Sequence, residues 1–85
     1  PKQRTYIEHE SENIHLMSGR MPISEANDVL YAHFPVEEAH TIGGLIVNRL
    51  RHIPVEGDSI TEQGYRLTVM EADARSVIKV RVERL

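Results

Sequence analysis

"HTIGGLIVNRLRHIPVEGDSITEQGYRL", residues 40–67, contains the change of hydrophobic period that decides the fold. Thr41 is placed to cap a helix that Ile53-Pro54 ends. The apolar and bordering residues of this helix recur at helical spacing: Ile42, Leu45, Ile46, Arg49 and Leu50. After Gly57-Asp58, apolar and polar residues alternate instead, which is the period of a half-buried strand. The stretch therefore predicts one helix followed by strands.

Downstream of this stretch the alternation continues to the end of the sequence. It predicts three strands, over residues 59–61, 65–72 and 76–85. Turn residues separate the strands at 62–64 and 73–75. The pattern directs six side chains to the core: Tyr65, Leu67, Val69, Ile78, Val80 and Val82. It directs five others outward: Arg66, Thr68, Lys79, Arg81 and Glu83.

Upstream, residues 5–8 and 13–17 are candidate strands on either side of the polar break at 9–12. Gly19 follows in a turn, where it is available for a positive φ. A short helix over residues 24–32 is predicted, with Ser24 as its N-cap. Its apolar stripe consists of Ile23, Ala26, Val29, Leu30 and Phe34. The order β-β-α-α-β-β-β predicts an α+β domain, with a mostly antiparallel sheet of about five strands and two helices on one face.

Composition limits the function classes. The chain has 85 residues, 13 acidic against 10 basic, and a net charge of −3, which argues against a nucleic-acid partner. There is no cysteine and no apolar run long enough to insert in a membrane. We interpret residues 1–4 as a linker remnant of a longer protein and residues 5–85 as the domain.

No candidate active site follows from the motifs. Gly43-Gly44 lacks the surrounding pattern of a nucleotide loop and is better explained by close packing of a helix on the sheet. Asp58 and Asp73 fall in turns, and Glu71 does not form an arguable acid–base pair with them. The five histidines, His9, His15, His33, His40 and His52, are too scattered to predict a metal site. An enzyme is therefore not expected.

Several motifs along residues 5–83 together resemble the CorC/HlyC transporter-associated domain. They are Gly19-Arg20 to Asn27, Glu37-Glu38, Thr41 with Gly44-Leu45-Ile46, Ile53-Pro54 with Gly57-Asp58, Gly64-Tyr65, and Val77 to Val82. The sequence departs from the family at two places. Ala39-His40 stands where the family more often has an aspartate or a tyrosine-aspartate pair, and Arg75-Ser76 stands where the family tends to have a pair of basic residues.

The resemblance implies a regulatory domain without catalytic residues. Such domains follow CBS domains in magnesium and cobalt efflux or hemolysin-like membrane proteins, on the cytoplasmic side of the plasma membrane. Their fold is similar to part of FAD-binding domains, which implies FAD or another adenine nucleotide as the cofactor. The matching positions here are Thr41, Gly43, Gly44, Pro54, Gly57 and Asp58. The expected partners are the neighbouring CBS and transmembrane domains.

Two other functions remain open at this point. The first is a pure interaction module that binds no small molecule and forms a homodimer, either through an exposed strand edge or through the outward Arg66, Lys79 and Arg81. The second is a flavin-dependent enzyme, although 85 residues hardly enclose the cofactor that it needs.

Overall fold

A computed structural model describes residues 7–85 of the chain. Its elements are β1 (Ile7–Ser11), β2 (Ile14–Ser18), α1 (Ile23–Leu30), α2 (Ile42–Leu50), β3 (Ser59–Glu62), β4 (Tyr65–Ala72) and β5 (Val77–Arg84). The predicted order of two strands, two helices and three strands is confirmed, and so is the α+β class.

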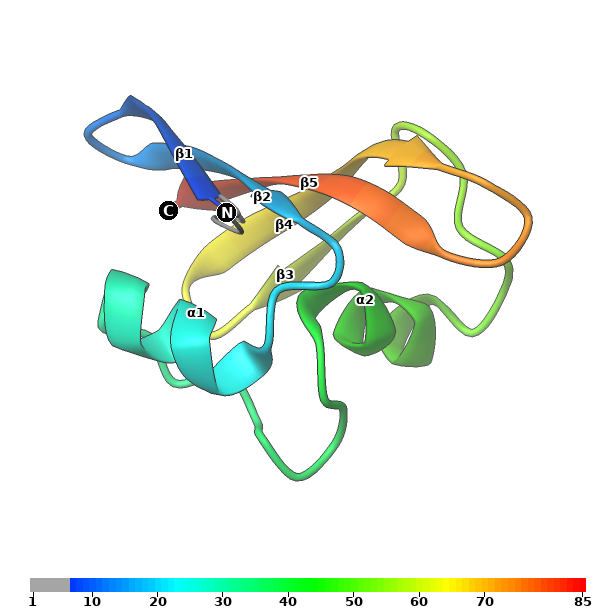
Figure 1. Ribbon diagram of the computed structural model, residues 1–85, viewed down its shortest axis with the longest axis horizontal. Helices are drawn as coiled ribbons and strands as arrows, with labels where there is room; N and C mark the ends of the chain where they lie inside the picture. Colours follow the sequence, from blue (N-terminus) through cyan, green and yellow to red (C-terminus); the bar gives the residue numbers. More distant parts are fainter. Residues whose placement is uncertain (1–6) are drawn as a thin grey trace, which may run out of the picture.

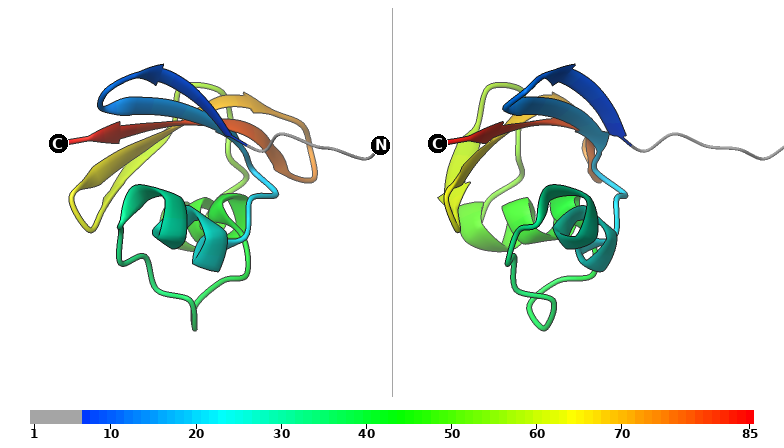
Figure 2. Two further views of the ribbon diagram at one scale, coloured as in Figure 1. Left: turned by 60° about the vertical axis from the view of Figure 1, so that its left-hand side comes forward. Right: turned by 90° about the vertical axis from the view of Figure 1, so that its left-hand side faces the viewer.

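All five strands form one antiparallel sheet, in the order β1-β2-β5-β4-β3. The last strand in the sequence, β5, lies at the centre and joins the N-terminal hairpin to β4. Both helices lie against the same face of the sheet, and within residues 7–85 no helix covers the opposite face (Figure 1, Figure 2). The predicted arrangement of helices on one face is therefore confirmed.

The core lies between this sheet face and the two helices. Its largest fully buried side chains are Met17, Ile23, Ile42, Leu45, Ile46, Leu67, Val69, Val80 and Val82. The ring of Phe34 packs edge-on against Tyr65, with centroids 5.5 Å apart. The hydroxyl of Tyr65 donates to the carbonyl of Leu30 over 3.1 Å, which ties β4 to the end of α1.

The turn of the N-terminal hairpin is shorter than predicted. β1 continues through the expected polar break to Ser11, and the turn is confined to residues 12–13. Residues 9–11 are polar because β1 lies at the edge of the sheet, where most of its side chains are exposed. The interpreted linker at 1–4, and the start of the predicted first strand at 5–6, lie outside the described residues.

α1 differs from the prediction in the residue at which it begins and in the side chains that it buries. Its N-cap is Pro22 (φ −62°), whose carbonyl accepts from Glu25 N and Ala26 N, so Ser24 lies inside the helix and caps nothing. Val29 is 49% exposed, because the buried face of α1 consists of Ile23, Ala26 and Leu30. The helix ends at Leu30 rather than at residue 32, since Tyr31 has the left-handed conformation that stops it (φ 56°).

Position 19 requires a glycine because there is no room for a side chain, and not because its backbone has a positive φ. The positive-φ glycines among the described residues are Gly57 and Gly64. A Cβ at Gly19 would overlap the carbonyl of Val77. The chain can therefore pass from β2 toward α1 only by crossing close over the start of β5.

Ile78 does not face the core as predicted. The pairing of β4 with β5 shifts register between Val69 and Ala72, so that Val77 pairs with Ala72 and Val80 with Val69. These shifts turn Val77 inward (3% exposed) and Ile78 outward (38% exposed). The inward directions of Tyr65, Leu67, Val69, Val80 and Val82 are confirmed.

Candidate functional site

The backbone amides in the first turn of α2 already have hydrogen-bond acceptors within the chain. Thr41 is the N-cap, as predicted, and its Oγ1 accepts from Gly44 N over 3.1 Å. The other two amides of the turn donate to the preceding segment, Ile42 N to Met21 O at 2.9 Å and Gly43 N to Gly19 O at 2.8 Å. Free amides at a helix start are what bind a phosphate. None of these three is free for that purpose.

The two glycines of α2 have different roles. A Cβ at Gly43 would lie 2.8 Å from the carbonyl oxygen of Gly19 and 3.3 Å from Cβ of Val77, so Gly43 lets the helix approach the chain at this point. A Cβ at Gly44 would lie 3.3 Å from Oγ1 of Thr41 and 3.5 Å from Cβ of Ala39, so Gly44 is not pressed against the sheet. The close-packing interpretation of Gly43-Gly44 therefore holds for Gly43 alone.

The other positions that match the family motifs, Pro54, Gly57 and Asp58, lie after α2. Pro54 is buried. Gly57 (φ 98°) and Asp58 turn the chain into β3, where Asp58 Oδ2 accepts from Val55 N over 2.9 Å. Both residues also pair by backbone with Val69, through Gly57 N to Val69 O and Val69 N to Asp58 O at 2.8 Å each. Asp58 thus has the turn-forming role expected of it.

A groove runs between α2 and the connection from β4 to β5. It consists of two adjoining cavities of about 230 and 330 Å³ that share Val47, Arg75 and Ser76 in their walls. Thr41, Gly43 and Gly44 line the first cavity, and Pro54 lines the second. Gly57 and Asp58 line neither. We call these two cavities the α2 groove.

Three arginines border the α2 groove: Arg20 and Arg75 at the first cavity, Arg51 and Arg75 at the second. All three are exposed, and none of them forms an ion pair with another residue of the range 7–85. The carboxylate of Asp73, in the same wall, accepts instead from the backbone amides of Arg75 and Ser76. The groove thus offers guanidinium groups to an anion, beside the apolar side chains of Val47 and Ile53.

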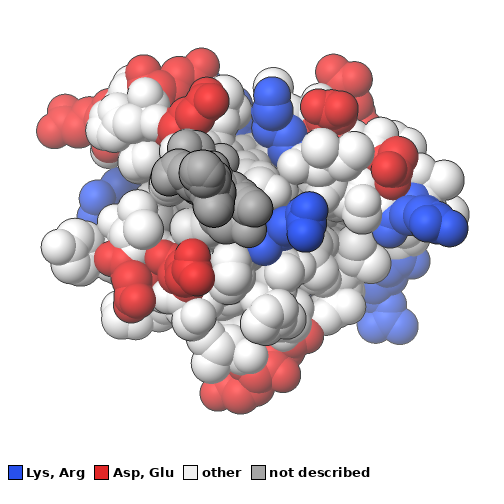
Figure 3. Space-filling model, viewed as in Figure 1, with Lys and Arg blue, Asp and Glu red and all other residues white. Residues whose placement is uncertain are grey.

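Figure 3 shows basic side chains at the right-hand side of the molecule, around the connection from β4 to β5. Sequence reasoning did not single out Arg20 or Arg51 as site residues. Arg20 directly follows the turn glycine of the family-like segment, and Arg51 directly follows the last residue of α2. These local positions, one after a turn glycine and one after the end of a helix, were the available signal in the sequence.

The outward basic residues Arg66, Lys79 and Arg81 do lie on the open face of the sheet, but two of them have acidic neighbours. Arg66 pairs with Glu83 at 3.4 Å, and Arg81 pairs with Glu83 and Glu10 at 3.7 Å each. Figure 3 shows acidic and basic side chains interspersed along the top of the view, where the sheet lies. The open face is therefore of mixed charge.

Two of the five histidines lie together. His9 and His15 face one another across β1 and β2, with ring centroids 4.9 Å apart at 78°. Burial, and to a lesser extent the charge of His9, lowers the pKa of His15 below 6.5. Their six-residue spacing in a hairpin was the signal for this pair. In residues 7–85 no three histidine, aspartate or glutamate side chains are grouped to hold a metal ion.

Comparison with known proteins shows which family has this fold. Residues 8–85 match the CorC_HlyC family, the transporter associated domain. The magnesium and cobalt efflux protein CorC of Salmonella typhimurium is 42% identical over 60 residues, which are 71% of this chain and 20% of that protein. The chain therefore spans about a fifth of the length of this relative.

Solved structures agree in fold. The CorC-associated region of a putative Mg²⁺ and Co²⁺ transporter from Neisseria meningitidis superimposes with a TM-score of 0.88 at 30% identity, covering 94% of this chain and 99% of that one. A hemolysin domain from Xylella fastidiosa, in complex with Mg²⁺ and Mn²⁺, gives 0.83 at 25% identity, covering 94% and 98%. No helix of the described residues has the length and hydrophobicity to cross a membrane. The chain belongs to the CorC_HlyC family of transporter associated domains.

Proposed function

We propose that this chain is a non-enzymatic regulatory domain of a membrane ion-efflux protein, on the cytoplasmic side of the membrane and next to CBS and transmembrane domains. The family and the name of the Salmonella relative support the association with magnesium and cobalt efflux. The match to only a fifth of that relative supports a role as one part of a larger transporter.

The observation that carries the binding role is the α2 groove with its three arginines. Arg20, Arg51 and Arg75 make no ion pair with another described residue, although the chain as a whole is acidic. Guanidinium groups recognise phosphate and carboxylate oxygens in a bidentate manner. The ligand that fits is an anion with an apolar portion, and an adenine nucleotide or FAD has this chemistry.

Such a domain regulates transport only if its ligand binds two states of the transporter with different affinity. The α2 groove is suited to this because its walls come from separate segments, the chain around Arg20, the start and end of α2, and the β4–β5 connection. A neighbouring domain that contacts any of these segments would alter the distance between the arginines. Ligand binding and transport would then be coupled in both directions.

Thermal unfolding of the isolated chain with FAD, AMP and ATP tests the ligand. The crystallised Neisseria chain consists of this domain almost alone, because the present chain covers 99% of it. A domain of the family therefore folds in isolation. A ligand at about a hundred times its dissociation constant adds roughly 2.7 kcal/mol, a rise of several degrees in a domain of this size. The double variant Arg20→Glu/Arg75→Glu should abolish the rise, and Lys79→Glu/Arg81→Glu, an equal charge change outside the groove, should retain it.

Efflux of cobalt by the full-length transporter tests the regulatory role separately. The groove variant should change the efflux rate at equal protein abundance, and the Lys79→Glu/Arg81→Glu variant should not. An unchanged rate after deletion of the whole domain would contradict regulation. If no nucleotide raises the unfolding temperature, the proposed ligand is wrong but the proposed regulatory role is not affected.

A homodimer is the second candidate, favoured by the open face of the sheet. Met70 and Ile78 are each 38% exposed, and Lys79 beside them has no ion-pair partner among residues 7–85. If this face joins two copies, Lys79→Glu/Arg81→Glu should convert a dimer to a monomer in sedimentation equilibrium. A monomeric parent chain at every concentration would exclude this candidate.

A further inference from the structure

The hairpin of β1 and β2 brings two imidazole rings to one place at the edge of the sheet. His9 and His15 are directly opposed in the register, and His15 is opposed on its other side by the buried Val82. Directly paired residues of antiparallel strands share a face. Both rings therefore lie on the face of the sheet that carries the helices, with His9 exposed and His15 half-buried.

The separation of the rings fits two ligands of one metal ion. A metal bonded to imidazole nitrogen at about 2.1 Å lies roughly 3.2 Å from the ring centroid, so two ligating rings have centroids about 5 Å apart. The observed separation is 4.9 Å. His9 is exposed, and rotation about its χ2 angle would turn a ring nitrogen toward a shared ion at little cost.

The surroundings leave the rings available. Neither ring makes a hydrogen bond to another residue of the described part of the chain. His15 also lines a cavity of about 170 Å³ at the end of α1, where Glu12 is the acidic lining residue and Arg84 the basic one. The cavity has room for water molecules on the His15 side of the pair, and water supplies the remaining ligands of an ion held by two side chains.

We propose that His9 and His15 form a two-imidazole site for a divalent transition-metal ion such as Co²⁺, Ni²⁺ or Zn²⁺. Imidazole nitrogen suits these ions, whereas Mg²⁺ requires oxygen ligands in octahedral geometry and is not bound here. Since no third histidine or carboxylate joins the pair within residues 7–85, the site is open and binds more weakly than a closed four-ligand site. Its use as a sensor of transported cobalt rests on the proposed function, but the site itself does not.

Titration of the untagged isolated chain with CoCl₂ tests the site, by calorimetry and by NMR. Bound Co²⁺ is paramagnetic and should broaden the signals of residues around 9 and 15 first, whereas MgCl₂ at the same concentration should leave them unchanged. His9→Ala and His15→Ala should each weaken Co²⁺ binding by about tenfold or more. His52→Ala, which removes another exposed imidazole, is the matched control and should bind like the parent.

His9 is the decisive position because it is exposed on the edge strand, so its variant should fold even if the His15 variant is perturbed. A thermal melt checks the fold of each. Equal affinity of His9→Ala and the parent, or no Co²⁺ binding by the parent, would overturn the site and leave the regulatory proposal intact. Site-specific binding with unchanged cobalt efflux in His9→Ala would retain the site and remove its sensing role.

Discussion

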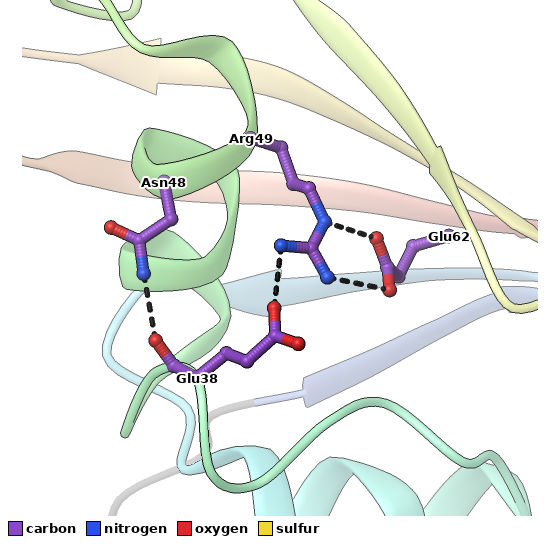
Figure 4. A network of polar contacts seen from close by, with 4 residues as sticks. All are labelled: Glu38, Asn48, Arg49 and Glu62. Carbon is purple, nitrogen blue, oxygen red and sulfur yellow. Dashed lines mark hydrogen bonds and ion pairs between the residues drawn. The ribbon is translucent and has the colours of Figure 1, made fainter.

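Arg49 binds the carboxylate of Glu62 through two nitrogens of its guanidinium group. Nε of Arg49 donates to Oε1 at 2.8 Å and Nη2 donates to Oε2 at 3.1 Å, and Glu62 is only 8% exposed. Nη1 of the same arginine contacts Glu38 at 2.6 Å, and Asn48 donates to the carbonyl of Glu38 (Figure 4). Hydrogen bonds to Glu62 and then Glu38 raise the pKa of Arg49 further above its usual value. One side chain thus joins α2, β3 and the segment before α2.

Arg49→Met should lower the urea midpoint of unfolding more than Glu38→Ala does. The reason is that Arg49→Met leaves a carboxylate buried without its partner, whereas Glu38 is half exposed and its loss leaves Arg49 bound to Glu62. Replacing both partners, as Arg49→Met/Glu62→Leu, should recover much of the loss, because no charge then remains buried. A double variant that is less stable than Arg49→Met alone would contradict this account.

Substitution of the three glycines near α2 should follow the order of their contacts. Gly19→Ala should prevent the native fold, because the Val77 carbonyl occupies the place of the new methyl group. Gly43→Ala should destabilise by about 1–2 kcal/mol, since overpacking against the backbone of Gly19 outweighs the gain in helix propensity. Gly44→Ala should be at least as stable as the parent. Chemical denaturation of the three variants measures this order, and a destabilised Gly44→Ala would break it.

The local parts of this fold were predictable and the parts that depend on register were not. Thr41, Gly57 and Asp58 act through neighbours a few residues away, so their turn and capping roles follow from the sequence. The contact of His9 with His15 depends on which residues of two strands pair. The α2 groove depends further on how a helix packs beside a strand connection, which no local pattern contains.

The register shift between β4 and β5 gives a direct test of one failed prediction. Alternation directs Ile78 inward, but the shift buries Val77 in its place. Val77→Ala should therefore cost about 2 kcal/mol, whereas Ile78→Ala should change stability by less than about 0.5 kcal/mol. Urea denaturation of both variants distinguishes the two registers, and a larger loss for Ile78→Ala would favour uninterrupted alternation.

Asp73 should contribute stability that depends on pH. The backbone amides of Arg75 and Ser76 both donate to its Oδ1 at 2.8 Å, and these bonds lower the pKa of Asp73 from its usual value of 3.8. A carboxyl group whose pKa is lower in the folded chain stabilises the fold above the unfolded value and loses that contribution as pH falls through the folded value.

Asp73→Asn should therefore be less stable than the parent at pH 7, and the difference should narrow as the pH falls below about 4. Thermal unfolding from pH 7 to pH 2.5 measures this difference. Since Asp73 is exposed, the effect should be small and should decrease further in high salt. A difference that stays constant over the whole pH range would mean that the turn requires the shape of the side chain and not its charge.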